Sequence, residues 1–406
     1  MRGGFFPFLA FAACSIISAP SSSAQSLVPA PSQRPEHINI ERLTKQANDG
    51  NIDAQFQLGL AYELGRGVEK SIGYAMAWYQ KAADRGGPGA ENNLGHLYET
   101  GPEGVKNLRE AVKWYTRGAL YGNPEAQYNL GRLYLQGQGV PQDKTEGFRW
   151  IRKSEEAGCV TAMAGLGWMY ATGFGVPKDE REALRLTQKA AKKGELSAIV
   201  NLGAFYVLGI GLPQNPQEAR KWFQKGVEAG SAEAEFDLAV LYQTGKGGDK
   251  NPQEALRLFQ LAAAQRLAKA EAVLGEMFEL GAGVQADSTE AVKWYRLSIQ
   301  DGHVDSAIRL ASILFYGKGV PQNLTEAVRL WTWAAEKGNP LAQFNLAQRY
   351  AEGAGVPRDL NKARELFTLA GEKMDVSKQL DALSPQDHVT EALEVQPEPE
   401  PAQEAQ

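Results

Sequence analysis

The sequence predicts an all-α protein, a right-handed α/α superhelix (solenoid) of nine helix–loop–helix repeats of 36 residues each. Two observations lead to this prediction. A leucine recurs at every 36th position from Leu58 to Leu346, and a glycine stands seven positions after each leucine, from Gly65 to Gly353. A fixed period of this length is typical of stacked helical hairpins, none of which can bury its apolar face alone.

The composition fits a folded protein. The chain has 406 residues, of which 43% are hydrophobic and 22% are charged, and its formal net charge is −5. This hydrophobic fraction is ordinary for a globular chain. The negative sign of the charge excludes a polycation that coats nucleic acid, so we expect no nucleic-acid partner.

The first helix of each repeat is defined by residues four positions apart. Ala54, Leu58 and Tyr62 share one helical face. Gly59 lies beside them, and its cost to helix stability, about 1 kcal/mol, is offset only if another helix packs closely there. Gly65 is expected to end the helix, because glycine readily adopts the left-handed conformation after a helix C-terminus.

The second helix of each repeat begins at a residue that caps helices well, 13 positions after the leucine. Glutamate follows three positions later in seven repeats, from Glu110 to Glu326. This spacing predicts a capping box, in which each side chain bonds to the free amide of the other residue. The capping residues are Ser71, Asn107, Asp143, Asp179, Asn215, Asn251, Asp287, Asn323 and Asp359.

The N-terminus has the pattern of an export signal over residues 1–24. Arg2 precedes an apolar stretch at 5–19, and small residues follow at 22–24. The stretch is shorter than the roughly 20 residues that span a bilayer. We therefore expect an exported protein, periplasmic or secreted. The alternative is a lipoprotein anchored through Cys14, which is the one case in which we expect membrane association.

The remaining segments complete the expected organisation. Residues 25–38, rich in Ser and Pro, form a linker, and the array spans 39–376 with an N-terminal capping helix at 40–50. Residues 377–406 form a Pro- and Glu-containing acidic tail that we expect to be disordered. After signal cleavage Cys159 alone would remain, which excludes an internal disulfide.

This pattern resembles the Sel1-like repeat family, a relative of the tetratricopeptide repeat. The resemblance rests on Ala-x3-Leu-Gly-x2-Tyr-x2-Gly-x-Gly-Val followed by Asp or Asn and Ala-Ala-x2-Gly, and it covers about residues 40–376. Repeats six and nine depart from the terminal glycine, with Arg266 and Met374. The resemblance implies an adaptor or regulator, including roles in envelope signalling and exopolysaccharide production.

Residues that could support catalysis are scattered. His37, His96, His303 and His388 are far apart, and no spacing of His or Cys suits a metal. No Gly-x-Ser-x-Gly motif occurs, so we expect no enzyme and no cofactor. Some secreted, cysteine-rich Sel1-like proteins have been associated with β-lactam binding. This chain lacks their cysteine pairs, which leaves a β-lactamase-like hydrolase as a remote alternative.

Repeats four and five place apolar residues where other repeats are polar. A patch with a central tryptophan has the composition of a binding hot spot. The alternative is that superhelical curvature buries these residues against adjacent helices. The candidates for partner binding are Met163, Trp168, Phe174, Ile199, Val207 and Ile210.

A second candidate surface is basic. Repeats two to five carry a pair of cations on the second helix, four residues apart, which would stack into a ridge; in repeat five they are Lys221 and Lys225. It could bind an anionic polymer or an acidic protein, or it could be a solvated helix face whose cations pair with glutamates. The ridge residues are Lys113, Arg117, Arg149, Lys153, Arg185 and Lys189.

These observations favour an exported, non-enzymatic scaffold that binds a protein or peptide in its superhelical groove. The alternative function is recognition of cell-wall or acidic polysaccharide through the basic ridge.

Overall fold

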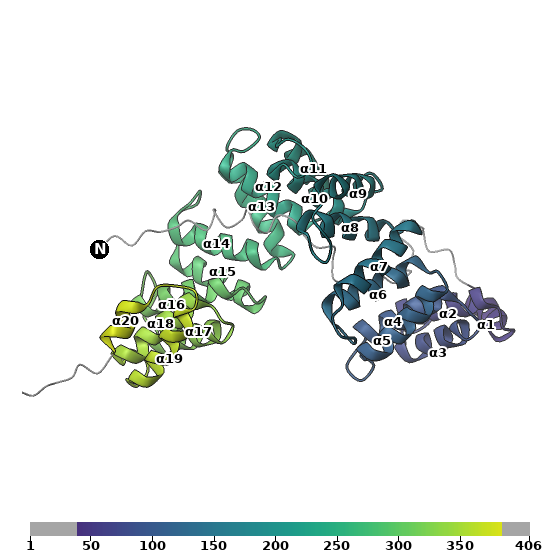
Figure 1. Ribbon diagram of the computed structural model, residues 1–406, viewed down its shortest axis with the longest axis horizontal. Coiled ribbons are helices and arrows are strands. Elements are labelled where there is room, and N and C mark those ends of the chain that lie inside the picture. Colours follow the sequence, from purple (N-terminus) through teal and green to yellow (C-terminus); the bar gives the residue numbers. More distant parts are fainter. Residues whose placement is uncertain (1–38, 384–406) are drawn as a thin grey trace, which may run out of the picture. The chain divides into compact units, whose positions relative to one another are not determined.

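The computed structural model describes residues 39–383, and this part of the chain contains helices and no strands (Figure 1). The first helices of the nine repeats are α2 (Ile52–Leu64), α4 (Pro88–Thr100), α6 (Pro124–Gln136), α8 (Val160–Thr172), α10 (Leu196–Leu208), α12 (Ala232–Thr244), α14 (Ala268–Leu280), α16 (Val304–Tyr316) and α18 (Pro340–Glu352). The second helices are α3 (Ile72–Ala83), α5 (Leu108–Leu120), α7 (Lys144–Glu156), α9 (Glu180–Lys192), α11 (Pro216–Glu228), α13 (Pro252–Ala264), α15 (Ser288–Gln300), α17 (Leu324–Glu336) and α19 (Leu360–Gly371). Two further helices flank the array, α1 (Ile40–Asn48) and α20 (Ser377–Ala382).

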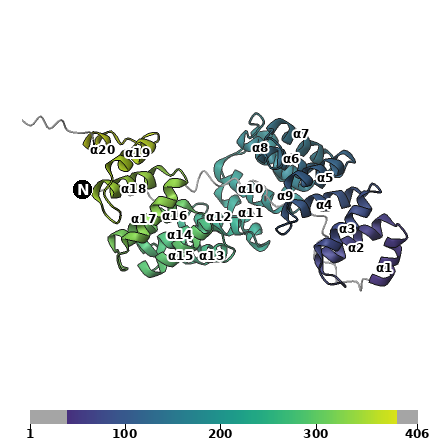
Figure 2. The ribbon, with the colours of Figure 1, turned by 90° about the horizontal axis from the view of Figure 1, so that it is seen from below.

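Helices pack chiefly against their neighbours in sequence. Each first helix packs against the second helix of its own repeat, as α6 and α7 do in Figure 1 and α16 and α17 do in Figure 2. This arrangement is an α/α solenoid, which confirms the predicted fold class. The described residues divide into two compact units, 39–265 and 266–383, and each has its own apolar clusters.

Close helix packing at the repeat glycines is confirmed. Leu58 is 1% exposed. A Cβ atom on the adjacent Gly59 would lie 2.6 Å from the ring of Tyr79 in α3, far inside contact distance. Gly65 ends α2 with a φ of 70°, in the left-handed region that the sequence predicted. Gly101 differs, with a φ of −61°, because the loop of repeat two has a different sequence.

The predicted N-caps are confirmed. The second hydrogen bond of the predicted capping box, from the amide of the N-cap residue to the glutamate three positions later, is wrong. The side chain of Asp287 accepts hydrogen bonds from the amides of Thr289 and Glu290 at the start of α15. The amide of Asp287 is already used, since it donates to the carbonyl of Phe278 in α14 at 2.8 Å. Glu290 therefore has no free amide to accept from and pairs with Lys293, 2.5 Å away.

The predicted capping helix is present at the N-terminal end of the array, whereas the C-terminal end differs from the prediction. Helix α1 packs against α2 as the expected capping helix. At the other end residues 377–382 form α20, and Leu380 and Leu383 pack near Phe367 of α19, so these residues do not belong to a disordered tail. The signal peptide, Cys14, the linker up to residue 38 and the tail from 384 lie outside the described residues. Among residues 39–383, no helix combines the length and apolarity that a membrane span requires.

Candidate interaction surface

Half of the predicted apolar patch is buried in repeat junctions. Met163 and Ile199 are 2% and 9% exposed. In repeat one the same position is Gln55, whose amide donates to the carbonyl of Ala47 in the preceding helix. The position therefore faces the previous repeat, and an apolar side chain there packs into the junction. Ile210 is also buried. The assignment of these three residues to a partner-binding surface is corrected accordingly.

The other three patch residues, Trp168, Phe174 and Val207, are half-buried. Trp168 in α8 contacts Phe174 in the following loop in a tilted arrangement, with ring centroids 5.2 Å apart. Val207 lies in α10 and does not line the cavity that these two rings border. Of the predicted patch residues, only Trp168 and Phe174 therefore lie together at the surface, as a local aromatic pair.

The aromatic pair forms one wall of a cavity of about 140 Å³, which we call the Trp168 pocket. Helices α6, α7 and α8 supply its lining together with the loop after α8. Its residues are Tyr128, Arg132, Leu135, Gln136, Ile151, Gly165, Trp168, Met169 and Phe174. Only Trp168 and Phe174 were predicted from the sequence. Met169 follows the repeat pattern, Gly165 has no side chain to draw attention to it, and the other lining residues come from the previous repeat.

A buried ion pair sets the electrostatics of the pocket. The guanidinium of Arg132 lies 2.5 Å from Glu99 and donates to Gln136 at 3.2 Å, whereas its Nε atom has no hydrogen-bond partner within the described residues. Tyr115 also donates to Glu99. Burial and the neighbouring Glu99 carboxylate raise the pKa of the Tyr115 hydroxyl well above its usual value, so this tyrosine stays neutral.

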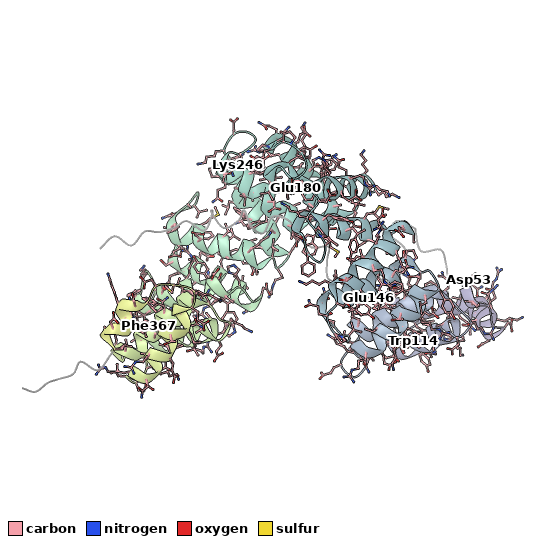
Figure 3. All side chains as sticks on the ribbon, viewed as in Figure 1. Asp53, Trp114, Glu146, Glu180, Lys246 and Phe367 are labelled. Atoms are coloured by element: carbon pink, nitrogen blue, oxygen red, sulfur yellow. The ribbon has the colours of Figure 1, made fainter. Side chains whose placement is uncertain are left out.

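The first cation of each ridge pair (Lys113, Arg149 and Arg185) forms an ion pair with a carboxylate. Lys113 lies 2.5 Å from Glu110, and Arg185 lies 2.6 Å from Glu182. Arg149 pairs in the same way with Glu146 of α7, which is labelled in Figure 3. Each of these carboxylates belongs to the glutamate three positions after an N-cap residue, which the sequence had assigned to a capping box.

The second cation of each ridge pair (Arg117, Lys153 and Lys189) also has a partner. Arg117 bonds to the buried carboxylate of Glu91 at 2.7 Å, and Lys189 pairs with Glu155 at 3.1 Å. The ammonium of Lys153 lies 4.6 Å from the centroid of the Trp150 ring. The ridge is therefore a helix face whose cations already have partners. This agrees with the second interpretation, a solvated helix face whose cations have partners, rather than with a free anion-binding surface.

Lys113 and Arg117 also border an outer groove of about 500 Å³ on α5, together with the exposed Leu120 and Tyr121. Its cations are the paired ones of the ridge.

The described residues contain no cluster of His, Cys, Asp and Glu that could hold a metal. The ring of His303 has a structural contact, since its Nδ1 accepts from the amide of Ser306 at the start of α16. Cys159 is a buried free thiol, and burial raises its pKa above the ordinary value. A thiol held neutral in this way is a poor nucleophile.

Comparison with known proteins gives a family match over most of the array. The Sel1 repeat model matches residues 52–87, 88–123, 124–159, 160–195, 196–231, 232–267, 268–303, 304–339 and 340–373. A Sel1 repeat protein from Oxalobacter formigenes is 26% identical, with a TM-score of 0.56 over 88% of this chain and 96% of that one. A protective antigen of uropathogenic Escherichia coli that displays the same repeat fold is 27% identical, with a TM-score of 0.36 over 86% and 94% of the two chains. No curated protein matches the chain at a significant level.

Proposed function

Because the chain belongs to the Sel1 repeat family, whose members are generally protein-interaction scaffolds, we propose that it is a non-enzymatic scaffold of the cell envelope. It binds a protein or peptide partner on the first helices of its repeats. The observation that carries the proposal is the half-buried Trp168–Phe174 pair beside a cavity. An aromatic residue at a pocket rim is typical of a binding hot spot.

Export rests on the sequence pattern at the N-terminus, which supports a periplasmic or secreted protein, or a lipoprotein if Cys14 is acylated. The pairing of the ridge cations removes the reason to propose an anionic polymer as the partner. Likewise, no group of residues in the described part of the chain supports a hydrolase.

The test is crosslinking in the native cell, followed by mass spectrometry of the captured proteins. A Trp168→Ala change should weaken capture of one specific partner by about 2 kcal/mol or more. The matched control is Tyr121→Ala, which removes an aromatic residue that is 61% exposed on the outer groove of α5 and should leave capture unchanged. Failure of the wild-type protein to capture any specific partner would refute the scaffold function. Recovery of the protein from the cytosol in cell fractionation would refute its envelope location.

A further inference from the structure

We propose that the Trp168 pocket receives one leucine- or phenylalanine-sized side chain of a protein partner, and that Lys144 pairs with an acidic residue beside that side chain. The proposal rests on the scaffold function and adds the chemistry of the segment that is recognised.

The size and walls of the pocket select the apolar side chain. A cavity of about 150 Å³ lined by Leu, Ile and Phe holds a benzene molecule in another protein, and the Trp168 pocket measures about 140 Å³. Leu135, Ile151 and Met169 form much of its lining. Water gains few hydrogen bonds against such walls, so an apolar group from a partner is the favourable occupant.

One residue on the pocket wall departs from the repeat pattern. Gly165 stands one position before the repeat leucine and lies on the pocket wall. The same position in the other eight repeats has a side chain, namely Gln57, Asn93, Asn129, Asn201, Asp237, Val273, Arg309 and Asn345. Gly165 lies in the middle of α8, where glycine costs helix stability by about 1 kcal/mol relative to alanine. An open pocket is a functional reason for that cost.

Charge at the pocket selects an acidic neighbour. The ammonium of Lys144 lies 4.4 Å from the centroid of the ring of Phe174, which lines the pocket. Lys144 is exposed and has no carboxylate partner in the described part of the chain, whereas Arg149 on the same helix is paired. A partner carboxylate next to the apolar side chain complements this ammonium group.

The experiment measures binding of short acetylated peptides to the full chain by ligand-observed NMR. The probes share a Gly-Ser background and carry Phe-Glu, Phe-Lys or Ala-Glu at the centre. We expect the Phe-Glu peptide to bind in the millimolar range that one small anchor permits. The Phe-Lys peptide should bind at least threefold more weakly, and the Ala-Glu peptide should not bind. Equal signals from all three peptides, or none from the Phe-Glu peptide, would overturn the proposal.

Three variants test whether the peptide binds in the pocket. Gly165→Asn introduces the residue found in four other repeats and places a side chain on the pocket wall, so the Phe-Glu peptide should lose at least tenfold in affinity while the protein stays folded. Gly165→Ala adds one methyl group, favours the helix, and should lose affinity by a smaller factor. Lys144→Ser should abolish the preference for Phe-Glu over Phe-Lys. Unchanged peptide binding by folded Gly165→Asn and Gly165→Ala proteins would contradict the proposal.

The same variant separates this proposal from the scaffold function. If Gly165→Asn still captures the partner that the wild-type protein captures in cells, the scaffold function stands and the pocket assignment is wrong. If the wild-type protein captures no partner, the scaffold function fails, whereas the peptide measurements still decide whether the pocket binds its probe.

Discussion

At the scale of single residues, glycine has two different roles in the helices. Gly59 in α2 faces the ring of Tyr79, whereas Gly73 at the start of α3 has no atom within 4 Å of the position a Cβ would take. Both residues are helical, so they share the conformational cost of glycine and differ only in what surrounds them.

This difference predicts opposite effects for one substitution within the first repeat. Gly59→Ala should destabilise the protein, because an overpacked contact costs about 1–3 kcal/mol and exceeds the gain in helix propensity. Gly73→Ala should stabilise it by up to about 1 kcal/mol. Thermal unfolding of the two variants checks the prediction. If Gly59→Ala were as stable as Gly73→Ala, the close helix approach at the repeat glycine would not be a constraint.

Glu271 is a buried residue whose charge state depends on pH. It is 1% exposed in α14, and burial, followed by repulsion from Asp301, raises its pKa from 4.5 to about 7. Arg266 opposes this rise and binds Asp301 through two nitrogen atoms. Arg266 also replaces the glycine that ends most second helices, and it adopts a left-handed φ of 63°.

Because the folded pKa of Glu271 is raised, folding favours the neutral carboxyl. The stability that depends on this group is fully present below about pH 4.5 and is lost as the pH rises towards about 7. Glu271→Gln should therefore have a Tm above that of the wild-type protein at pH 8, and the difference should vanish near pH 4.5. Melting curves across this range provide the measurement, with the more exposed Glu290→Gln as control. A difference that does not vary with pH would contradict the assignment.

At the scale of helices, the N-cap residue and the glutamate three positions later contribute separately to the stability of the helix. The side chain of Asp287 caps α15, but its amide bonds to the first helix of the repeat. Loss of an N-cap costs about 0.5–2 kcal/mol, and loss of a surface ion pair costs about 0.2–1 kcal/mol.

Asp287→Ala should therefore destabilise unit 266–383 clearly more than Glu290→Ala does. Chemical denaturation of the two variants and of the double variant measures both effects. Additive losses are expected, since the two side chains have different partners. A strong coupling between the two substitutions would indicate that the two side chains do act together as a capping box, contrary to the structure.

The sequence predicted the helices well because each of their signals is local. A cap, an apolar face and a terminal glycine lie within one helix and recur in most repeats, so the bounds of α2 to α19 follow largely from them. The capping box failed because the amide of Asp287 is used by a bond to another helix, which local spacing does not record. The Trp168 pocket was found only in part for the same reason, since Tyr128 and Arg132 reach it from the preceding repeat.

At the scale of the whole molecule, stability is distributed along the chain. Helices pack on their neighbours in sequence, so the free energy of unfolding is approximately a sum of repeat and junction contributions. A local defect in such an array changes the opening of nearby helices more than that of distant ones. The two units, each with its own apolar clusters, strengthen this expectation.

Leu94→Ala tests this view, because Leu94 is 1% exposed and belongs to an apolar cluster of the first two repeats. The substitution removes buried methyl groups and should cost about 2–5 kcal/mol locally. Hydrogen exchange followed by mass spectrometry should show faster exchange in α3 to α6 and unchanged exchange in α16 to α19. Leu346→Ala, the equivalent change in repeat nine, should give the reverse pattern. If either variant accelerated exchange uniformly from residue 39 to residue 383, the array would unfold as one cooperative block, and additive repeat energetics would not describe it.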